Sequence, residues 1–300
     1  MRSARILTAS PRPLALPGLT RPDLADEGGV DVDAAVRRAV ELGAGAIRFG
    51  DGEVLAAGGL PAWVAAARAA GARTIEIETS GVPLARPELA RQLRSLGVDG
   101  IVVPLYGADA DAHDWIAGQA GAQQRTLRGI RAARGAGLRV RVVLPVLRPT
   151  YRGLDQLVAR TLPLGVPAFE IRAPEALPAM LWANPALTAP FVRKATALAS
   201  AARREVTVVG MPACLLQEQA ARAVEVNGPE LQIDARRNAP AFDNDSSDNG
   251  APACESCRWA AHCAKPSAAT LTAFGAVALH ARVDQPPRSQ RPRPRGESDD

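Results

Sequence analysis

The residues whose types and spacing most clearly suggest chemistry are the four cysteines, all in the last third of the chain. Cys214 is followed after thirty-nine residues by Cys254, Cys257 and Cys263, which form a Cys-x-x-Cys-x5-Cys run. Residues 1–213 contain no cysteine, whereas thiols that merely fill a core would be spread over the whole chain. Four thiolates complete the coordination of a tetrahedral zinc ion or of a 4Fe–4S cluster. The spacing therefore favours one four-thiolate site over buried free thiols.

The overall composition indicates the cellular compartment in which such a site would exist. A chain of 300 residues that is 47% hydrophobic can bury one large core. Its apolar runs are shorter than the roughly 18 residues that span a bilayer, and residues 1–20 are too interrupted by proline for a signal peptide. We therefore expect a cytoplasmic protein without a membrane partner. In that reducing compartment a Cys-x-x-Cys pair more often holds metal than forms a disulfide.

The net charge of +5 comes almost wholly from arginine, because Lys194 and Lys265 are the only lysines. Nucleic-acid surfaces combine clustered arginine with aromatic residues, and only 4% of this chain is aromatic. Nucleic acid is therefore not an expected partner. Residues 282–300 mix proline and arginine and end in two aspartates, which predicts a disordered tail.

The elements that must position the cysteines follow a repeat. Apolar runs typical of strands alternate with helical patterns; the runs are Arg5–Thr8, Ala46–Phe49, Thr74–Thr79, Gly100–Tyr106, Arg139–Leu147, Ala168–Arg172 and Glu205–Val209. A glycine that suits a helix end precedes five of them, at Gly43, Gly71, Gly97, Gly137 and Gly165. Such units predict right-handed crossovers and a parallel sheet.

We predict an α/β fold, a partial (β/α)6 TIM-like barrel over residues 1–210, with a complete barrel as the second choice because six strand–helix pairs are too few for eight units. Residues 211–281 form the predicted cysteine-rich region, and residues 282–300 the tail. The stretch Gln232–Ala251 is rich in Asp, Asn and Ser and is predicted to be a solvated loop between the first cysteine and the other three.

Function in a parallel sheet lies where the strands end. After the second strand, Gly50-Asp51-Gly52-Glu53 could let a ligand approach the backbone while Glu53 accepts hydrogen bonds from an amine; a plain turn with solvated acids explains the pattern equally well. His113 and Asp114 could form a general-base pair, although a role at a helix start is favoured.

Five charged residues lie within predicted strands, namely Arg48, Glu76, Glu78, Glu170 and Arg172. Because side chains alternate along a strand, Glu76 and Glu78 share one face. In a barrel that face could be the interior, where the arginines would pair with the glutamates and a polar ligand could bind. The alternative is that these residues face the edges of the helix layer or solvent.

Several stretches, taken in order, carry a resemblance. They are Asp51-Gly52-Glu53-Val54, Thr79-Ser80-Gly81, Pro104-Leu105-Tyr106-Gly107 and the segment from Pro212 through the four cysteines to Gly275. They resemble the Gly-Gly-Glu-Pro, Thr-Asn-Gly, Ser-Leu-His-Gly and auxiliary-cluster motifs of the radical S-adenosylmethionine (SAM) superfamily, in its members with a C-terminal SPASM or twitch domain. The resemblance covers roughly residues 4–275. It implies one C-terminal 4Fe–4S cluster on the four cysteines, with zinc as the alternative, and candidate cofactor contacts at Gly52 and Glu53.

One departure from the family changes the expected function. The family holds its catalytic cluster with Cys-x-x-x-Cys-x-x-Cys after the first strand, but residues 9–18 here contain no cysteine, histidine or carboxylate. Iron–sulfur clusters depend on thiolate ligands, so SAM binding is in doubt and a pseudoenzyme is predicted. It would act as partner or scaffold for a peptide-modifying radical SAM protein, or on a peptide. Two alternatives remain: an active enzyme whose open cluster uses three C-terminal cysteines, and a zinc-stabilised α/β enzyme or binding protein.

Overall fold

The computed structural model describes most of the chain with several gaps. The described residues are 2–7, 31–50, 52–174, 180–222, 231–235, 239–240, 251–260, 263–266, 268–276 and 279–284. The loop 9–18, Asp51 and residues 285–300 of the predicted tail lie outside these ranges. So does most of the predicted loop between the first cysteine and the other three.

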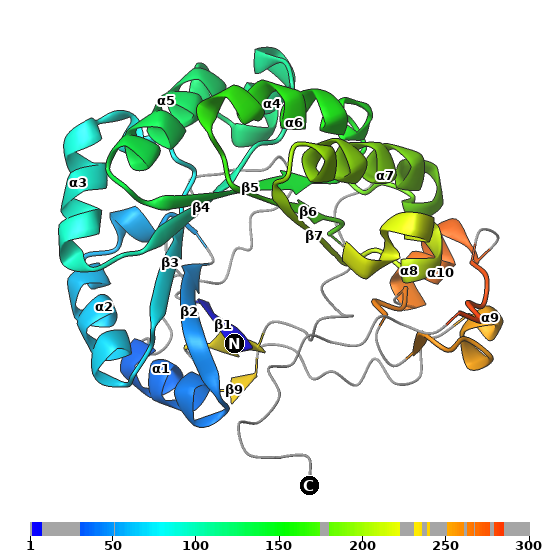
Figure 1. The fold of residues 1–300 in the computed structure, drawn as a ribbon, viewed down its shortest axis with the longest axis horizontal. Coiled ribbons are helices and arrows are strands. Elements are labelled where there is room, and N and C mark those ends of the chain that lie inside the picture. Colours follow the sequence, from blue (N-terminus) through cyan, green and yellow to red (C-terminus); the bar gives the residue numbers. More distant parts are fainter. Residues whose placement is uncertain are drawn as a thin grey trace, which may run out of the picture.

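One curved sheet organises the fold (Figure 1). Its strand order is β7-β6-β5-β4-β3-β2-β1-β8-β9, and every pairing is parallel except that of β9 with β8. The strands are β1 Arg2–Leu7, β2 Ala44–Gly50, β3 Thr74–Glu78, β4 Gly100–Pro104, β5 Arg139–Pro145, β6 Ala168–Arg172, β7 Glu205–Val209, β8 Leu231–Asp234 and β9 Ala239–Pro240. The order ends at β7 and β9, so among the described residues this is an open, partial barrel.

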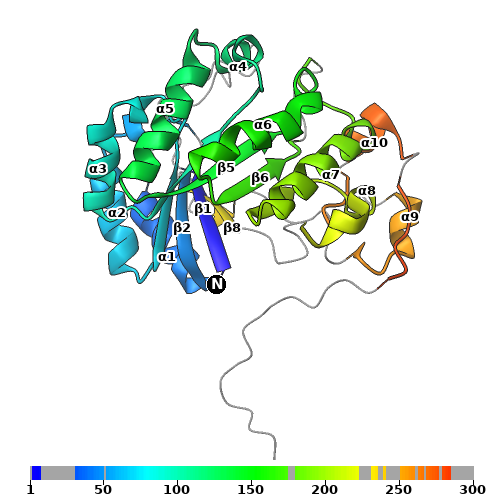
Figure 2. The ribbon, with the colours of Figure 1, turned by 45° about the horizontal axis from the view of Figure 1, so that its top comes forward.

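Helices cover the convex face of this sheet, and a separate group lies beyond β7 (Figures 1 and 2). The covering helices are α1 Val32–Glu41, α2 Leu60–Ala69, α3 Pro87–Leu96, α4 Ala110–Ala117, α5 Ala122–Gly135, α6 Leu154–Thr161 and α7 Pro185–Ala201. The group beyond β7 comprises α8 Ala213–Leu216, α9 Pro252–Glu255 and α10 Ala268–Phe274. Within the described ranges, no helix has the length and apolar character needed to cross a bilayer.

The alternation of side chains along the strands explains why helices cover one face only. In β3, Ile75 and Ile77 are fully buried in the main hydrophobic core, whereas Glu76 and Glu78 point to the opposite face. The other central strands repeat this pattern with residues such as Phe49 and Phe169 on the core side. Burial of each such apolar side chain contributes about 1.5–3 kcal/mol. The helix layer is therefore held by the apolar face, and the concave face is left to polar groups.

The predicted strands and helix ends are largely confirmed. All seven predicted strands are present, and the five predicted helix-ending glycines have positive φ angles, from 70° at Gly165 to 99° at Gly97. At Gly97 this left-handed conformation ends α3, where its N–H donates to carbonyls of the last turn. The partial barrel is confirmed as the correct choice over a complete one.

The prediction of a solvated loop from Gln232 onward was wrong at its beginning. Residues Leu231–Asp234 form β8, which pairs with β1 in parallel. A four-residue run is too short to be recognised from its pattern, but β1 would otherwise present an unpaired edge to solvent. The need to cover that edge explains why a polar stretch adopts a strand.

Candidate functional site

The four cysteines are brought to one place by the elements that follow β7. Cys214 lies on α8, directly after the end of β7, and is buried. Cys254 lies on α9, Cys257 and Cys263 follow it, and these three are half-buried. All four line a single small cavity, together with Trp259 and His280. The structure therefore gathers the two sequence-distant parts of the predicted site.

Backbone groups already point at the sulfur atoms. The N–H of Ala213 donates to Sγ of Cys263 over 3.2 Å, and the N–H of Arg282 donates to Sγ of Cys257 over 3.3 Å. Burial raises the pKa of the Cys214 thiol, and the neighbouring Cys254 and Cys257 raise it further against an opposing backbone hydrogen bond at His280. A bound cation is what converts such a thiol to a thiolate ligand.

The four thiols supply the ligands that two kinds of group need. Zinc takes four thiolates around one point at about 2.3 Å. A 4Fe–4S cube takes one thiolate at each of its four irons. Across the described ranges, no group of three or more His, Cys, Asp or Glu side chains is arranged to hold a single metal ion. The donor set in the cavity is therefore compatible with either group.

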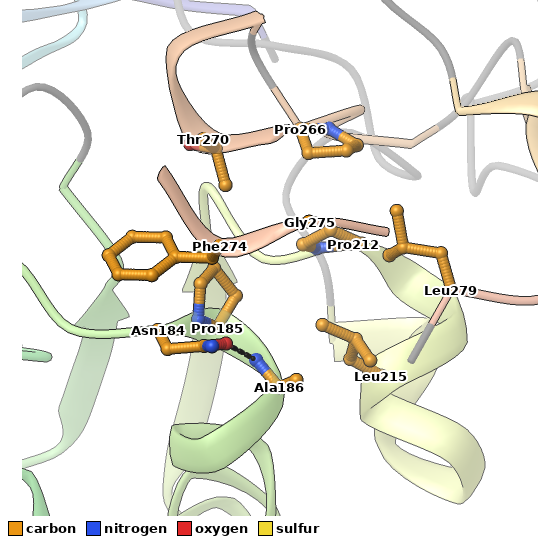
Figure 3. A pocket seen from close by; sticks show the side chains of 10 residues that line it. All are labelled: Asn184, Pro185, Ala186, Pro212, Leu215, Pro266, Thr270, Phe274, Gly275 and Leu279. Carbon is orange, nitrogen blue, oxygen red and sulfur yellow. Dashed lines mark hydrogen bonds between the residues drawn. The ribbon is translucent and has the colours of Figure 1, made fainter. Parts of the chain in front are cut away.

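A second cavity adjoins the cysteine site (Figure 3). It has a volume of about 160 Å³ and is mostly apolar, with Phe274, Leu215 and the first residues of α7 in its wall. Pro212, Pro266 and Leu279 line both cavities and so form the partition between them. An apolar group bound here would lie beside the cysteines.

The barrel interior holds a cluster of opposite charges, which we call the interior ion cluster: Arg5, Arg48, Glu76, Glu78, Glu170 and Arg172. Arg48 reaches Glu76 at 3.2 Å and Glu170 at 3.3 Å, although β2 and β6 are separated by three strands. Such a contact is possible only across the concave face. The prediction that these residues share the interior is therefore confirmed, and the solvent-facing alternative was wrong.

The members of the interior ion cluster pair with one another, although the buried Arg5 Nε and Glu78 Oε1 make no hydrogen bond. Arg5 donates to Glu78 at 2.5 Å, and Arg172 pairs with both Glu170 and Glu78. Burial alone would raise the pKa of Glu170, but Arg172 and Arg48 outweigh it and lower that pKa to about 2. The pKa of Glu78 is lowered in the same way, chiefly by Arg5 against burial. Three arginines and three glutamates thus balance within the chain.

Glu53 joins the ends of two strands. Its carboxylate is buried and accepts hydrogen bonds from the N–H and the hydroxyl of Ser80, at 3.0 and 2.7 Å, and from the N–H of Leu55 at 3.3 Å. Both carboxylate oxygens therefore already bind groups of the loops after β2 and β3. Gly52 precedes it with a φ of 121°, a conformation open to glycine. Contact of Gly52 and Glu53 with a cofactor stays a prediction.

His113 and Asp114 do not form a general-base pair. His113 is buried in α4, and its Nδ1 accepts a hydrogen bond from the N–H of Tyr106 at 3.2 Å. Burial lowers its pKa to about 4, against a small opposing effect of Asp114. Asp114 instead accepts hydrogen bonds from the N–H groups of Gly121 and Gln123, at the start of α5. The predicted role at a helix start is confirmed for Asp114, whereas His113 lies inside α4.

Sequence reasoning missed Arg282, which it assigned to the tail. The guanidinium lies 4.4 Å from the ring centroid of Trp259, a buried residue of the cysteine cavity. It also donates to the carbonyl of Gln217 and pairs with Asp284. No spacing or motif marks an arginine in a proline-rich segment as part of a site.

The chain resembles known proteins over part of its length. Residues 30–157 match the sequence profile of the Radical SAM superfamily. The AdoMet-dependent heme synthase of Methanosarcina barkeri is 31% identical over 102 residues, which are 34% of this chain and 29% of that protein. The chain thus aligns with less than a third of the length of this curated relative.

Solved structures share the fold at low identity. The structure of anSMEcpe with bound AdoMet has a TM-score of 0.61 at 13% identity, covering 88% of each chain. Streptococcus suis SuiB bound to the precursor peptide SuiA has a TM-score of 0.59 at 11% identity, covering 78% of this chain and 58% of that one. At these identities the likeness shows the fold alone.

Proposed function

We propose that the protein is a radical SAM superfamily member, as the profile match over residues 30–157 supports, that it has lost SAM cleavage, and that it acts through one C-terminal 4Fe–4S cluster. In this role it is a partner or scaffold in peptide modification. The proposal covers the loss of chemistry, the single cluster and the peptide context.

The observation that carries the proposal is the one-sided distribution of sulfur. The loop after β1 is where the superfamily ligates its catalytic cluster, and residues 1–213 offer no thiolate there or anywhere else. Four cysteines remain, and all line one cavity at the far end of the barrel. A cluster closed by four thiolates has no iron free for the amino and carboxylate groups of SAM.

The residues present fit a saturated cluster. Cys214, Cys254, Cys257 and Cys263 would hold it, and the N–H groups of Ala213 and Arg282 would donate to two of the ligating sulfurs. When bound, a cluster of this kind supplies electron transfer or structural cross-linking. Glu53 would hold two strand ends together through its hydrogen bonds from Ser80 and Leu55.

The peptide context is supported by a solved relative and by the neighbouring cavity. SuiB shares the fold and was solved with its precursor peptide. The apolar cavity beside the cysteines, at about 160 Å³, has room for one large side chain of such a peptide. Its position would bring that side chain next to the cluster.

Anaerobic reconstitution with iron and sulfide tests the proposal. The wild-type protein is expected to bind about four irons per chain and to yield no 5′-deoxyadenosine when reduced with SAM. Cys254→Ala is expected to lose iron uptake, because a thiolate ligand is missing. Ser256→Ala, an exposed change within the same motif, serves as the matched control and should bind iron normally.

The other outcomes are equally informative. About one zinc per chain and no iron would replace the cluster with a structural zinc site. Formation of 5′-deoxyadenosine would show an active enzyme with an open cluster on the C-terminal cysteines. Either result would contradict the proposal.

A further inference from the structure

We propose that Arg282 is the positioning residue that assembles the two halves of the four-cysteine site and sets the environment of Cys257. This inference rests on the proposed function, because it assigns a role toward the same cluster. Cys214 belongs to the first half, on α8, and the run Cys254–Cys263 forms the second half. Arg282 lies outside both and contacts both.

The guanidinium of Arg282 binds the first half. Its Nη1 donates to the carbonyl of Gln217 at 2.9 Å and reaches the carbonyl of Ala213 at 3.4 Å. These carbonyls belong to the residue just before Cys214 and to the residue just after α8. The side chain therefore hydrogen-bonds to carbonyls at both ends of α8, the short helix that carries Cys214.

The same guanidinium rests on the second half. It stacks over the ring of Trp259, with its Cζ 4.4 Å from the ring centroid. Trp259 lies between Cys257 and Cys263 in the sequence. The face of a tryptophan ring attracts a guanidinium placed over it. Trp259 Nε1 donates to the carbonyl of Asp284 at 3.0 Å, and the carboxylate of Asp284 accepts two bonds from Arg282. The side chain of Arg282 is accordingly only 17% exposed.

The backbone of Arg282 completes the arrangement. Its N–H donates to Sγ of Cys257 at 3.3 Å, and its carbonyl accepts from the N–H of Arg258 at 2.9 Å. N–H donors to a ligating sulfur stabilise its negative charge and raise the reduction potential of an iron–sulfur cluster. The guanidinium contacts fix where this donor stands, so the side chain controls the bond made by the backbone.

The distance in sequence between the two halves of the site explains why a residue such as Arg282 is needed to join them. Thirty-nine residues separate Cys214 from Cys254, and bringing the ends of such a segment together costs conformational entropy. A planar guanidinium can bind two carbonyls, a carboxylate and a ring at once, whereas an ammonium cannot stack or bind in a bidentate manner. Arginine is therefore the residue suited to this position.

Reconstituted variants test the inference through the cluster itself. Arg282→Ala should retain iron at least about tenfold less well under chelator challenge, as for loss of a partner of metal ligands. Any cluster that remains should have a lower reduction potential than wild type. Arg282→Lys should lie between the two. Arg258→Ala changes an exposed side chain in the cysteine run and should match wild type.

A second measurement does not depend on metal. In metal-free protein carrying Cys254→Ser and Cys263→Ser, oxidative cross-linking of Cys214 to Cys257 reports how well the two halves meet. Adding Arg282→Ala should slow that cross-linking several-fold, and adding Arg258→Ala should not. If wild type binds no iron but cross-linking still depends on Arg282, the proposed function fails and the positioning role stands. Equal cross-linking with and without Arg282 overturns the inference, as do equal iron retention and potential in protein that binds iron.

Discussion

The barrel interior and the four-cysteine cavity solve the problem of burying reactive groups in opposite ways. In the interior ion cluster, three arginines face three glutamates, and the chain itself supplies every counter-charge. In the cysteine cavity, four groups of one kind surround a small space, and each would repel the others if ionised. The first region balances its charges as folded, whereas the second would need a bound cation to balance four thiolates.

The two regions also lie in different parts of the molecule. The interior ion cluster lies on the concave face of the sheet, where Arg48 of β2 reaches Glu170 of β6. The four cysteines line a cavity built by α8, α9 and the residues that follow α9, beyond β7 (Figure 1). If the two regions are independent, a change in one should leave the other unaltered.

The largest effect is expected from Arg48→Met. Removing this guanidinium takes a partner away from Glu76 at 3.2 Å and from Glu170 at 3.3 Å, and breaking a buried pair costs about 3–5 kcal/mol. Chemical denaturation measures the loss in free energy of unfolding. Arg139→Met, whose partner Glu205 is exposed, should cost less than about 1 kcal/mol.

Iron uptake by the folded Arg48→Met protein should equal that of wild type. A variant of unchanged stability would show that the interior ion cluster is not structural. A folded variant that loses iron would show that the interior and the cysteine site are coupled, contrary to the comparison.

A smaller effect is expected from acid, through His113. Its pKa is about 4 in the folded protein and 6.5 in the unfolded chain, so between these values the unfolded state binds more protons. Stability is therefore lost as the pH falls from about 6.5 towards 4, by on the order of 3 kcal/mol. His113→Asn keeps an acceptor for the Tyr106 N–H and should flatten this dependence.

Denaturation curves of wild type and His113→Asn across that pH range provide the test. Parallel curves would mean that His113 is protonated without cost and that another group causes any acid sensitivity. The titration of Glu170 lies lower, because its folded pKa is about 2, so the two groups are separable by pH.

The smallest effect is expected at Glu53. Glu53→Gln weakens the charge-assisted hydrogen bonds to Ser80, which should cost about 1–2 kcal/mol. A double-mutant cycle with Ser80→Ala should give a coupling energy of about 1 kcal/mol. Calorimetric titration with SAM should give no binding heat for wild type. Binding that disappears in Glu53→Gln without a change in stability would instead assign this residue to a cofactor.

Much of the fold could be predicted because local signals agree with it. The glycines that end helices, the apolar strands and the proline at the start of α3 each act within a few residues. β8 escaped prediction because its four residues carry too little pattern, and its reason to form is the edge of β1, far away in the sequence.

The candidate site divides in the same manner. The four cysteines could be grouped from type and spacing alone. Alternation placed Glu76 and Glu78 on one face, but only the curvature of the sheet decides that this face is the inside. Arg282 could not be predicted at all, because its partners at Gln217 and Trp259 are set by how the chain folds back.

The pairing of β8 with β1 has a consequence for the cysteine site. Cys214 follows β7, at one end of the sheet, while β8 stands near the other end and Cys254 returns to the cavity of Cys214. The polypeptide between Cys214 and Cys254 is therefore held to the N-terminal strand by the pairing of β8 with β1. The four-cysteine region is therefore not expected to fold as a separate fragment, because a chain that starts after β1 would lose the strand with which β8 pairs.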